Sequence, residues 1–284
     1  MSSQAELTQR FSRLKEISGI MTAMKGLSLV ETRKLARFIG HQRSMKANIE
    51  TAAADFLNFF PVASADETQP AILLLIGSER GFCGNFNERI LAAMAQLPNW
   101  DRAPVLLVLG HRLGTKLESH PGVIERLDGP TVTEDVPAVL NRLMDALHTA
   151  SKHSGSGAAL FCLAHGSEGE GEPKLKRLLP LALPPAPQRA HPPRLQLAPP
   201  EFFAELLDQY LLATLYGLLY ESLAAENRQR LAHMEHALDR LDETIAHLAL
   251  KRNALRQEKI VEEIEIILSS EQAFAEADAA KYPS

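Results

Sequence analysis

The sequence predicts an α/β protein in which two long terminal helices pair as an antiparallel coiled coil around a central α/β domain. The first observation is the distribution of proline: of 17 prolines, 16 lie between Pro61 and Pro200, and only Pro283 follows. Because proline removes a helical hydrogen bond and clashes with the preceding turn, the two proline-free arms are expected to be helices. We therefore expect a long helix in residues 1–60, an α/β domain in 61–200, and a longer helix in 201–284.

The second observation is the spacing of residues in the first arm. A 4-3 spacing, typical of a coiled-coil seam, predicts that one stripe of this helix faces a partner. The middle of the stripe is polar or small, which costs stability in a simple two-helix seam. We therefore expect the middle to be covered by a third surface, or exposed where the partner has ended. The stripe comprises Leu7, Phe11, Leu14, Ser18, Met21, Lys25, Ser28, Thr32, Leu35, Ile39, Gln42, Lys46, Ile49, Ala53 and Phe56.

The last arm carries the matching seam. Apolar residues alternate by three and four from Leu231 to Leu248, with Leu255 one heptad further on. After Leu255 the phase shifts to Val261, Ile264 and Leu268, which indicates a change in local winding. The segment 206–223 is apolar around most of its circumference, so we expect both the first arm and the middle domain to cover it.

The middle domain shows alternating strand and helix patterns. Apolar runs at Ala71–Ile76, Val105–Leu109 and Ala158–Leu163 alternate with helix-like stretches at Phe86–Leu97, Arg112–Glu118 and Val136–His153. This order predicts βαβ units on a mostly parallel sheet, which makes the insert Rossmann-like. We expect a solvated hairpin at Gly166–Glu172 and an extended return through Pro184–Pro200.

The most motif-like segment is GSERGFCGNFN, at Gly77–Asn87, directly after the first predicted strand. A glycine-rich turn of this kind can bind phosphate through backbone N–H groups. However, the GxxxGxxG spacing lacks both the GxGxxG fingerprint and the lysine of a phosphate-binding loop. A structural turn formed by Gly81, Cys83 and Gly84 is favoured over a nucleotide site. Use of Cys83 as a nucleophile, with His111 or His165 as its base, is disfavoured because no spacing supports it.

Composition and charge narrow the function classes. The first 60 residues carry a net charge of +4, and residues 201–284 carry −8. The mildly basic arm lacks interleaved aromatic residues, which argues against nucleic-acid binding. Two cysteines and scattered histidines give neither a disulfide framework nor a metal-ligand spacing. No run approaches the roughly 20 apolar residues of a membrane span, and the charged N-terminus differs from a signal peptide. We expect a cytoplasmic chain that uses no metal.

Three separated segments resemble the gamma subunit of F-type ATP synthases, the central rotor shaft of those complexes. IMTAMKGLSLVETRK, at Ile20–Lys34, is similar to the family pattern ITKAMxMVAxxKxRR. SERGFCGNFN, at Ser78–Asn87, is similar to the family's SDRGLCGGFN. Leu215–Ser270 is similar to the family's last helix and includes its RQ pair, Arg256 and Gln257. The matches stand in the family's order and spacing and together cover nearly the whole chain.

The resemblance implies an asymmetric axle inside a hexamer of alternating alpha and beta subunits. The α/β domain is then expected to bind the epsilon subunit and the membrane rotor ring, at the cytoplasmic face of the inner membrane. The chain would be a peripheral, non-catalytic subunit of an ATP synthase, with no active site and no cofactor of its own. Ion flow, of protons or sodium, would turn the shaft during ATP synthesis. The implied contacts with the hexamer are Met24 and Lys25, Arg230 beside them, then Arg33, Lys34, Arg37, Arg256, Gln257 and Glu263.

The sequence departs from the family pattern at several positions. Gly19 stands where the family usually has a lysine, and Met21 with Thr22 stands where it has a Thr-Lys pair. Gly26 interrupts the first predicted helix, and Val261 stands where a threonine is usual. These changes indicate a divergent branch or an alternative, sodium-linked F-type ATPase. Two other hypotheses stay open on the residues alone. One is a nucleotide-dependent α/β enzyme with helical oligomerisation arms, and the other is a general coiled-coil scaffold.

Overall fold

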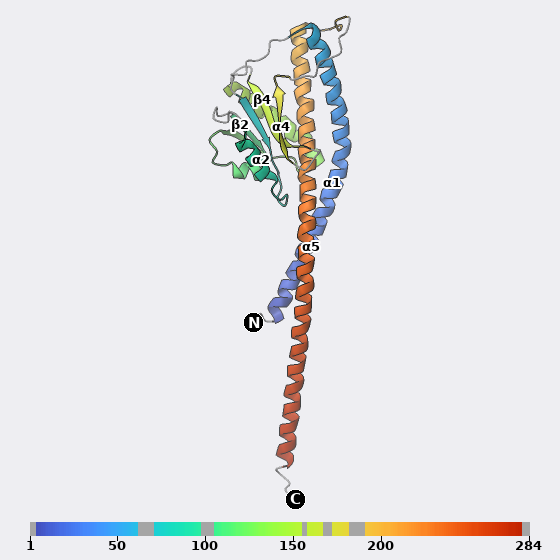
Figure 1. Ribbon diagram of the computed structural model, residues 1–284, viewed down its shortest axis with the longest axis vertical. Coiled ribbons are helices and arrows are strands. Elements are labelled where there is room, and N and C mark those ends of the chain that lie inside the picture. The colour runs from blue at the N-terminus through green and yellow to red at the C-terminus, as the bar shows by residue number, and fades with distance from the viewer. Residues whose placement is uncertain are drawn as a thin grey trace. The chain divides into compact units, whose positions relative to one another are not determined.

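The computed structural model describes residues 4–61, 71–97, 105–154, 158–166, 172–181 and 191–279, with side chains as far as Glu271. The chain divides into two compact units. Unit 1 comprises the residues up to Lys25 and those from Met234 onward, and unit 2 comprises Gly26–His233. Two helices contribute to both units (Figure 1): α1 (Gln4–Phe59) has 56 residues and α5 (Pro199–Ala279) has 81. The prediction of two long terminal helices, the second one longer, is confirmed.

A five-stranded sheet forms the centre of unit 2, with strand order β3-β2-β1-β4-β5. β1 pairs in parallel with β2 and β4, and β2 pairs in parallel with β3. β5 is antiparallel to β4, so the predicted mostly parallel sheet is confirmed. The strands are β1 (Ala71–Ile76), β2 (Val105–Leu109), β3 (Val123–Leu127), β4 (Ala159–His165) and β5 (Pro173–Leu179).

Helices cover both faces of this sheet. Ile72, Leu74 and Ile76 of β1 belong to a core cluster with α4, α1 and α5, whereas Leu73 and Leu75 belong to a second cluster with α2 and α3. This alternation follows from the period of two in a strand. Because β1 is buried on both faces, its sequence is continuously apolar. The helices are α2 (Phe86–Ala95), α3 (His111–Lys116) and α4 (Val136–Ser154), and the 3-10 turn η2 (Thr133–Asp135) precedes α4.

Within unit 2, α1 and α5 are antiparallel partners. The rings of Phe38 and Tyr220 lie 5.4 Å apart between centroids, and those of Phe56 and Phe202 lie 5.1 Å apart. Leu215 and Leu219 of α5 are fully buried in one cluster with α1 and the sheet. The prediction that both the first arm and the middle domain cover 206–223 is therefore confirmed.

Within unit 1, α1 and α5 are also antiparallel. Lys25 Nζ lies 2.8 Å from a carboxylate oxygen of Glu235, and the Arg252 guanidinium lies over the Phe11 ring, 4.7 Å from its centroid. All fifteen positions of the α1 stripe, in both units, are buried or half-buried. The 4-3 spacing therefore identified the packed face of α1 correctly, including its polar middle.

Beyond Leu255, α5 is not packed against another described part of unit 1. Every residue in Arg256–Glu271, here called the unpaired segment, is exposed. Its six large apolar residues are between 47% and 68% exposed: Ile260, Val261, Ile264, Ile266, Ile267 and Leu268. The shift in apolar phase that the sequence shows after Leu255 thus falls where packing on α1 ends.

By length and composition alone, α5 contains a window that meets the criterion for a membrane span. Eighteen residues within Pro199–Glu271 reach a mean hydropathy of 1.2 with at most two charged residues, and a third of the window is buried. The sequence had shown no uninterrupted apolar run of that length. The core helix of a folded domain meets the same criterion. Leu215 and Leu219 are fully buried, so α5 is a core helix in unit 2.

Two strands, β3 and β5, were not predicted from the sequence, and the effect of Gly26 on α1 was predicted wrongly. β3 (VIERL) and β5 (PKLKRLL) are edge strands with several exposed residues, so neither has the continuous apolar run of a central strand. α1 continues through Gly26, and a Cβ there would meet nothing within 4 Å, so the predicted interruption is wrong. Most of the hairpin predicted at Gly166–Glu172, and residues 182–190 of the proline-rich return, lie outside the described residues.

Candidate functional site

The turn Gly77–Asn87 leaves β1 and enters α2 in a conformation fixed by its own polar groups. The backbone N–H of Ser78 donates to Asn87 Oδ1 at 3.0 Å, and Asn87 Nδ2 donates to Ser78 Oγ at 2.8 Å. Both residues are buried. Gly77 is needed at the start of the turn, because a Cβ there would lie 2.3 Å from Leu113 Cβ. Ser78 and Asn87 therefore close the turn across nine residues.

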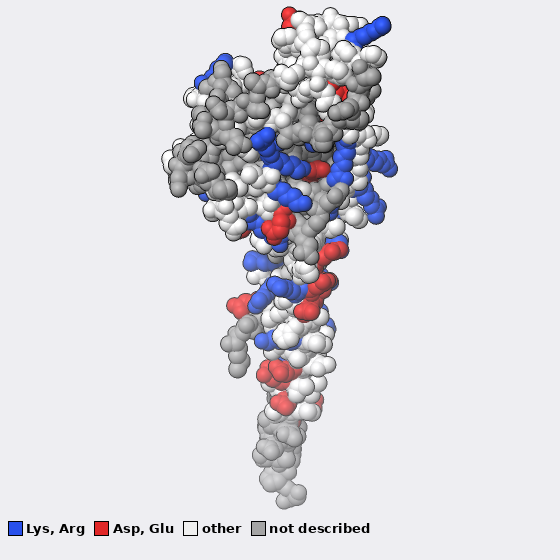
Figure 2. Space-filling view, turned by 45° about the horizontal axis from the view of Figure 1, so that its top comes forward, with Lys and Arg blue, Asp and Glu red and all other residues white. Residues whose placement is uncertain are grey.

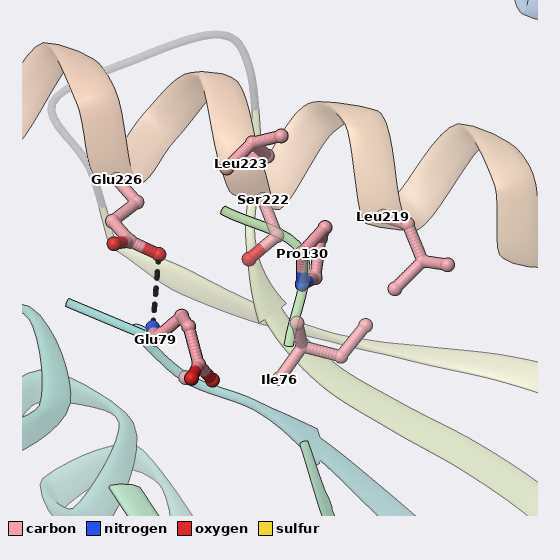
Figure 3. Close-up of a pocket in the computed structure, with 8 residues that line it drawn as sticks. Ile76, Glu79, Pro130, Leu219, Ser222, Leu223 and Glu226 are labelled. Carbon is pink, nitrogen blue, oxygen red and sulfur yellow. Dashed lines mark hydrogen bonds between the residues drawn. The ribbon is translucent and has the colours of Figure 1, made fainter. Parts of the chain in front are cut away.

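The helix α5 holds this turn through a buried ion pair. The Glu226 carboxylate accepts a hydrogen bond from the backbone N–H of Glu79 at 3.2 Å (Figure 3). It accepts a second hydrogen bond from the backbone N–H of Arg80 at 3.3 Å. Arg230 is ion-paired with Glu226 and donates through Nε to the carbonyl oxygen of Gly81 at 3.2 Å. The side chains of Glu226 and Arg230 are 5% and 6% exposed. Burial raises the pKa of the Glu226 carboxyl above 4.5, while the Arg230 charge acts in the opposite direction.

Glu79 extends this network to the ends of two neighbouring strands. Its carboxylate oxygen Oε2 accepts hydrogen bonds from the backbone N–H groups of His111, at 2.8 Å, and Gly129, at 2.7 Å. His111 follows β2, and Gly129 follows β3. One side chain thus joins the carboxyl ends of β1, β2 and β3. Glu79 thereby holds the turn.

The tip of the turn has a backbone conformation that disfavours most side chains. Gly84 has a φ of 58°, and Phe82, which is not a glycine, has a φ of 62°. A bulky residue in this region is strained. The surrounding hydrogen bonds, including that from Arg230 to Gly81, determine the conformation around Phe82. Gly81 and Cys83 thus both take part in hydrogen bonds at the tip of the turn.

The Cys83 thiol is not arranged for catalysis. Cys83 is 4% exposed, and its Sγ donates to the carbonyl oxygen of Arg80 at 3.6 Å. Burial raises its pKa, which disfavours the reactive thiolate. His165, considered as its base, instead has Nε2 2.9 Å from the carbonyl oxygen of Phe86. Burial also raises the pKa of Cys162, to about 12.

The geometry of the turn argues against a phosphate site. The N–H groups of Glu79 and Arg80, which a phosphate would need, already donate to Glu226. The pocket beside them measures about 10 Å³, which holds a single water. A second pocket of about 200 Å³, lined partly by His111, Arg126 and Asp128, is smaller than most ligand sites. The N–H groups at the start of the turn are thus engaged within the chain.

The predicted contact residues on α1 differ in their surroundings. Arg33 and Arg37 are exposed. Lys34 is ion-paired with Glu134 of η2, and Lys25 is ion-paired with Glu235. Met24 is half-buried. Arg33 and Arg37 therefore present guanidinium groups to the outside, while Lys25 and Lys34 also bind within the chain.

The predicted contact residues on α5 fall into two kinds. Arg230 is buried, and its guanidinium binds Glu226, Asn227 and the turn. It therefore serves the interior of unit 2, a role that the sequence analysis did not foresee. The other three lie in the unpaired segment and are exposed: Arg256, Gln257 and Glu263. Lys259 Nζ lies 3.8 Å from Glu263 Oε1.

Sequence reasoning missed Glu226, which holds the turn together with Arg230, and Asn227, which accepts a hydrogen bond from Arg230. Their signal was available: Glu226 and Arg230 stand four residues apart, at a spacing that places them side by side on a helix. They also follow directly on the largely apolar segment 206–223. A polar pair that continues a buried face of a helix is expected to be paired internally.

Comparison with known proteins identifies the family. The sequence model of a family described as ATP synthase matches residues 3–274. The chain belongs to this family. The ATP synthase gamma chain of Mycobacterium leprae (strain Br4923) is 25% identical over 295 residues, which cover 96% of this chain and 99% of the relative. The gamma chain of Saccharopolyspora erythraea is 26% identical over 307 residues, with 96% and 99% covered. The resemblance stated from the sequence is thus confirmed.

Solved structures of ATP synthases show the same fold. A chain in the Euglena gracilis mitochondrial ATP synthase (OSCP/F1/c-ring, rotational state 3) has a TM-score of 0.67 at 13% identity, covering 99% of this chain and 96% of that one. A chain in the central stalk and c-ring of the Tetrahymena thermophila mitochondrial ATP synthase has a TM-score of 0.55 at 14% identity, covering 77% and 99%. The fold of this family member is therefore retained at low sequence identity.

Proposed function

We propose that this chain is the central rotor shaft of an F-type ATP synthase, and that it couples ion-driven rotation to ATP synthesis or hydrolysis by other subunits. The observation that carries this proposal is the unpaired segment. Six large apolar side chains are exposed on a helix that continues beyond the packed part of unit 1. Large exposed apolar groups mark sites of interaction with another protein. The family match over 3–274 supports this proposal.

In this proposal, alpha and beta subunits surround the unpaired segment and the adjacent helix pair. The epsilon subunit and the membrane rotor ring bind the α/β domain, and the complex holds the chain at the cytoplasmic face of the membrane. The asymmetric helix pair displaces each beta subunit in turn as the ring rotates. The chain forms and breaks no covalent bond itself, and transmits torque through contact.

The charge distribution supports a sliding contact. Arg33 and Arg37 on α1 and Arg256 on α5 are exposed. Lysine and arginine side chains keep their charged groups in water while their methylene groups lie along an apolar surface. Their charged groups can therefore exchange partners during rotation. On the face shown in Figure 2, basic and acidic side chains are interspersed with uncharged ones along unit 1. We propose that Met24, Lys25, Lys34, Gln257 and Glu263 also contribute to this surface.

The proposal is tested by purifying the complex through a tag on this chain from cells that express the whole set of subunits. Alpha and beta subunits should co-purify with it in a fixed ratio. A double substitution in the unpaired segment, Val261→Asp with Ile264→Asp, should strongly reduce their recovery. These side chains are 53% and 50% exposed, so the substitutions should leave the fold of the chain intact.

The matched control is Leu175→Asp on β5, where the side chain is 43% exposed. It places one negative charge, against two in the double variant, on a similarly exposed apolar position outside the unpaired segment. Recovery of alpha and beta subunits should be unchanged in this variant. If neither subunit co-purifies with the unaltered chain, or if both variants lose them equally, the proposal is wrong.

A further inference from the structure

One aromatic ring in unit 1 contacts cations from both helices. The Phe11 ring on α1 has Lys15 Nζ 5.0 Å from its centroid, and Lys15 lies one turn further along the same helix. The Arg252 guanidinium, from α5, lies 4.7 Å from the same centroid. Both distances are within the range of a cation–π interaction. Of the two contacts, only the one with Arg252 joins the two helices.

The Phe11–Arg252 contact lies at the end of the helix pair. Leu7 and Leu248, near it on the two helices, are 5% and 6% exposed, and Leu255 is half-buried. From Arg256 onward every described side chain of α5 is exposed. Arg252 is therefore the last cation of α5 to contact α1 before the unpaired segment begins.

We propose that Phe11 and Arg252 form a clamp that fixes the rotation of α5 about its own axis at this end, and that the clamp thereby positions Arg256 and Gln257. Residues four apart on a helix lie on the same side, one turn from each other. Fixing the direction of Arg252 therefore fixes the direction in which Arg256 points. The positioning role rests on the proposed function, whereas the clamp itself does not.

Chemistry favours arginine for this role. The hydrophobic interaction between leucines in a seam is non-directional, so it allows the end of a helix to rotate about its own axis by small angles. A planar guanidinium over an aromatic face adds a preferred geometry while remaining partly hydrated. Phe11 supplies that face, and the polar edge of Arg252 remains in water at the boundary between paired and unpaired helix.

The clamp is tested with four variants in the assembled complex: Arg252→Gln, Phe11→Leu, the two combined, and Lys15→Gln. Lys15→Gln is the matched control, because it removes a cation from the same ring without removing a contact between helices. The first readout is hydrogen exchange of the backbone amides in residues 4–20. Arg252→Gln and Phe11→Leu should each accelerate this exchange about two- to fivefold, the scale of one partly exposed cation–π contact.

The double variant should exchange no faster than the quicker single variant, because both changes remove the same contact. Lys15→Gln should leave exchange nearly unchanged. Unaltered exchange in Arg252→Gln, or acceleration by Lys15→Gln to the same degree, would overturn the clamp.

The second readout separates positioning from general stability. Arg252→Gln should lower the ratio of ion-driven ATP synthesis to unloaded ATP hydrolysis, with unchanged subunit content. Equal loss of both rates would overturn the positioning role while leaving the exchange result valid. If alpha and beta subunits do not co-purify with the unaltered chain, the proposed function fails, and exchange of the isolated full chain still decides whether the clamp exists.

Discussion

The carboxylate of Glu226, on the long helix α5, accepts a hydrogen bond from the backbone N–H of Glu79, 147 residues earlier in the chain. The same carboxylate binds the N–H of Arg80 and the guanidinium of Arg230. Through Glu79, this contact reaches the ends of β2 and β3. The turn after β1 is therefore attached to α5 by a buried charged group within unit 2.

Replacing Glu226 should strongly destabilise unit 2. Glu226→Gln preserves the shape of the side chain but leaves the Arg230 guanidinium buried without its counter-charge. Breaking one partner of a buried ion pair typically costs about 3–5 kcal/mol. The measurement is denaturant unfolding of the full chain. Glu235→Gln is the control, since the Glu235 side chain is 50% exposed beside Lys25 and should change stability by less than about 1 kcal/mol. Equal effects of the two substitutions would contradict the role given to Glu226.

Two Gly→Ala substitutions should change stability in opposite directions. Gly84 has a φ of 58°, and a Cβ there would lie 3.4 Å from Gln229 Nε2, so Gly84→Ala should destabilise the chain by about 1–2 kcal/mol. Gly26 lies within the continuous helix α1 with open space around it. Gly26→Ala should therefore stabilise the chain by about 0.5–1 kcal/mol. Thermal unfolding of both variants checks this, and a shift of the same sign in both would count against the described backbone.

The stability of the chain should depend on pH through Asp135, which lies directly before α4. Asp135 Oδ2 accepts hydrogen bonds from Thr131 Oγ1 at 2.6 Å and from the backbone N–H of Thr131 at 2.9 Å. The side-chain bond from Thr131 is the largest cause that lowers the pKa of Asp135 below its ordinary 3.8. A lowered folded-state pKa means that ionised Asp135 stabilises the fold above pH 3.8, and that this contribution is lost as the pH falls through the lowered value.

Asp135→Asn should therefore lower stability by about 1 kcal/mol at pH 7, the typical value for a capping side chain. The difference from the unaltered chain should shrink as the pH falls below 3.8. Asp128→Asn, at a side chain that is 67% exposed, is the control and should show little difference at either pH. A difference for Asp135→Asn that stays constant over this range would refute the assignment.

Removing the RQ pair should uncouple the complex without unfolding the chain. Arg256 and Gln257 are exposed in the unpaired segment, so the double alanine variant should cost within about 0.5 kcal/mol of stability. Ion-driven ATP synthesis should fall about tenfold, the scale of one lost charged hydrogen bond, and ATPase turnover should fall by a smaller factor. Lys251→Ala, another exposed cation of α5, is the control. Full activity of the double variant would show that these residues are not the contact, and loss of assembly would show that their role is structural.

The sequence predicted the buried parts of this fold better than its edges. β1 and β2 were predicted with their observed bounds, because central parallel strands are buried on both faces and appear as continuous apolar runs. β3 and β5 were missed because edge strands expose polar residues. The α1 stripe was predicted even through Lys25 and Gln42, since helical spacing persists where the residues themselves are polar.

The candidate site was only partly predictable. The motif of the turn was evident, but its partner on α5 was not, because pairing over more than 140 residues leaves no local pattern. Arg230 was expected to contact other subunits, and the structure instead shows it buried with Glu226. A heptad pattern reveals where an apolar seam ends. Arg256 and Gln257 follow the end of the seam, which is consistent with their exposure.

The central claim is that this chain is a rotating shaft, and single-molecule rotation tests it most directly. Asp145→Cys places a thiol on an exposed position of α4, while the native Cys83 and Cys162 are buried, so a probe can be attached at that thiol. With the alpha and beta subunits of the purified complex fixed to a surface, ATP should drive continuous rotation of the probe in one direction. ATP hydrolysis by the intact complex with no rotation of the probe would contradict the account.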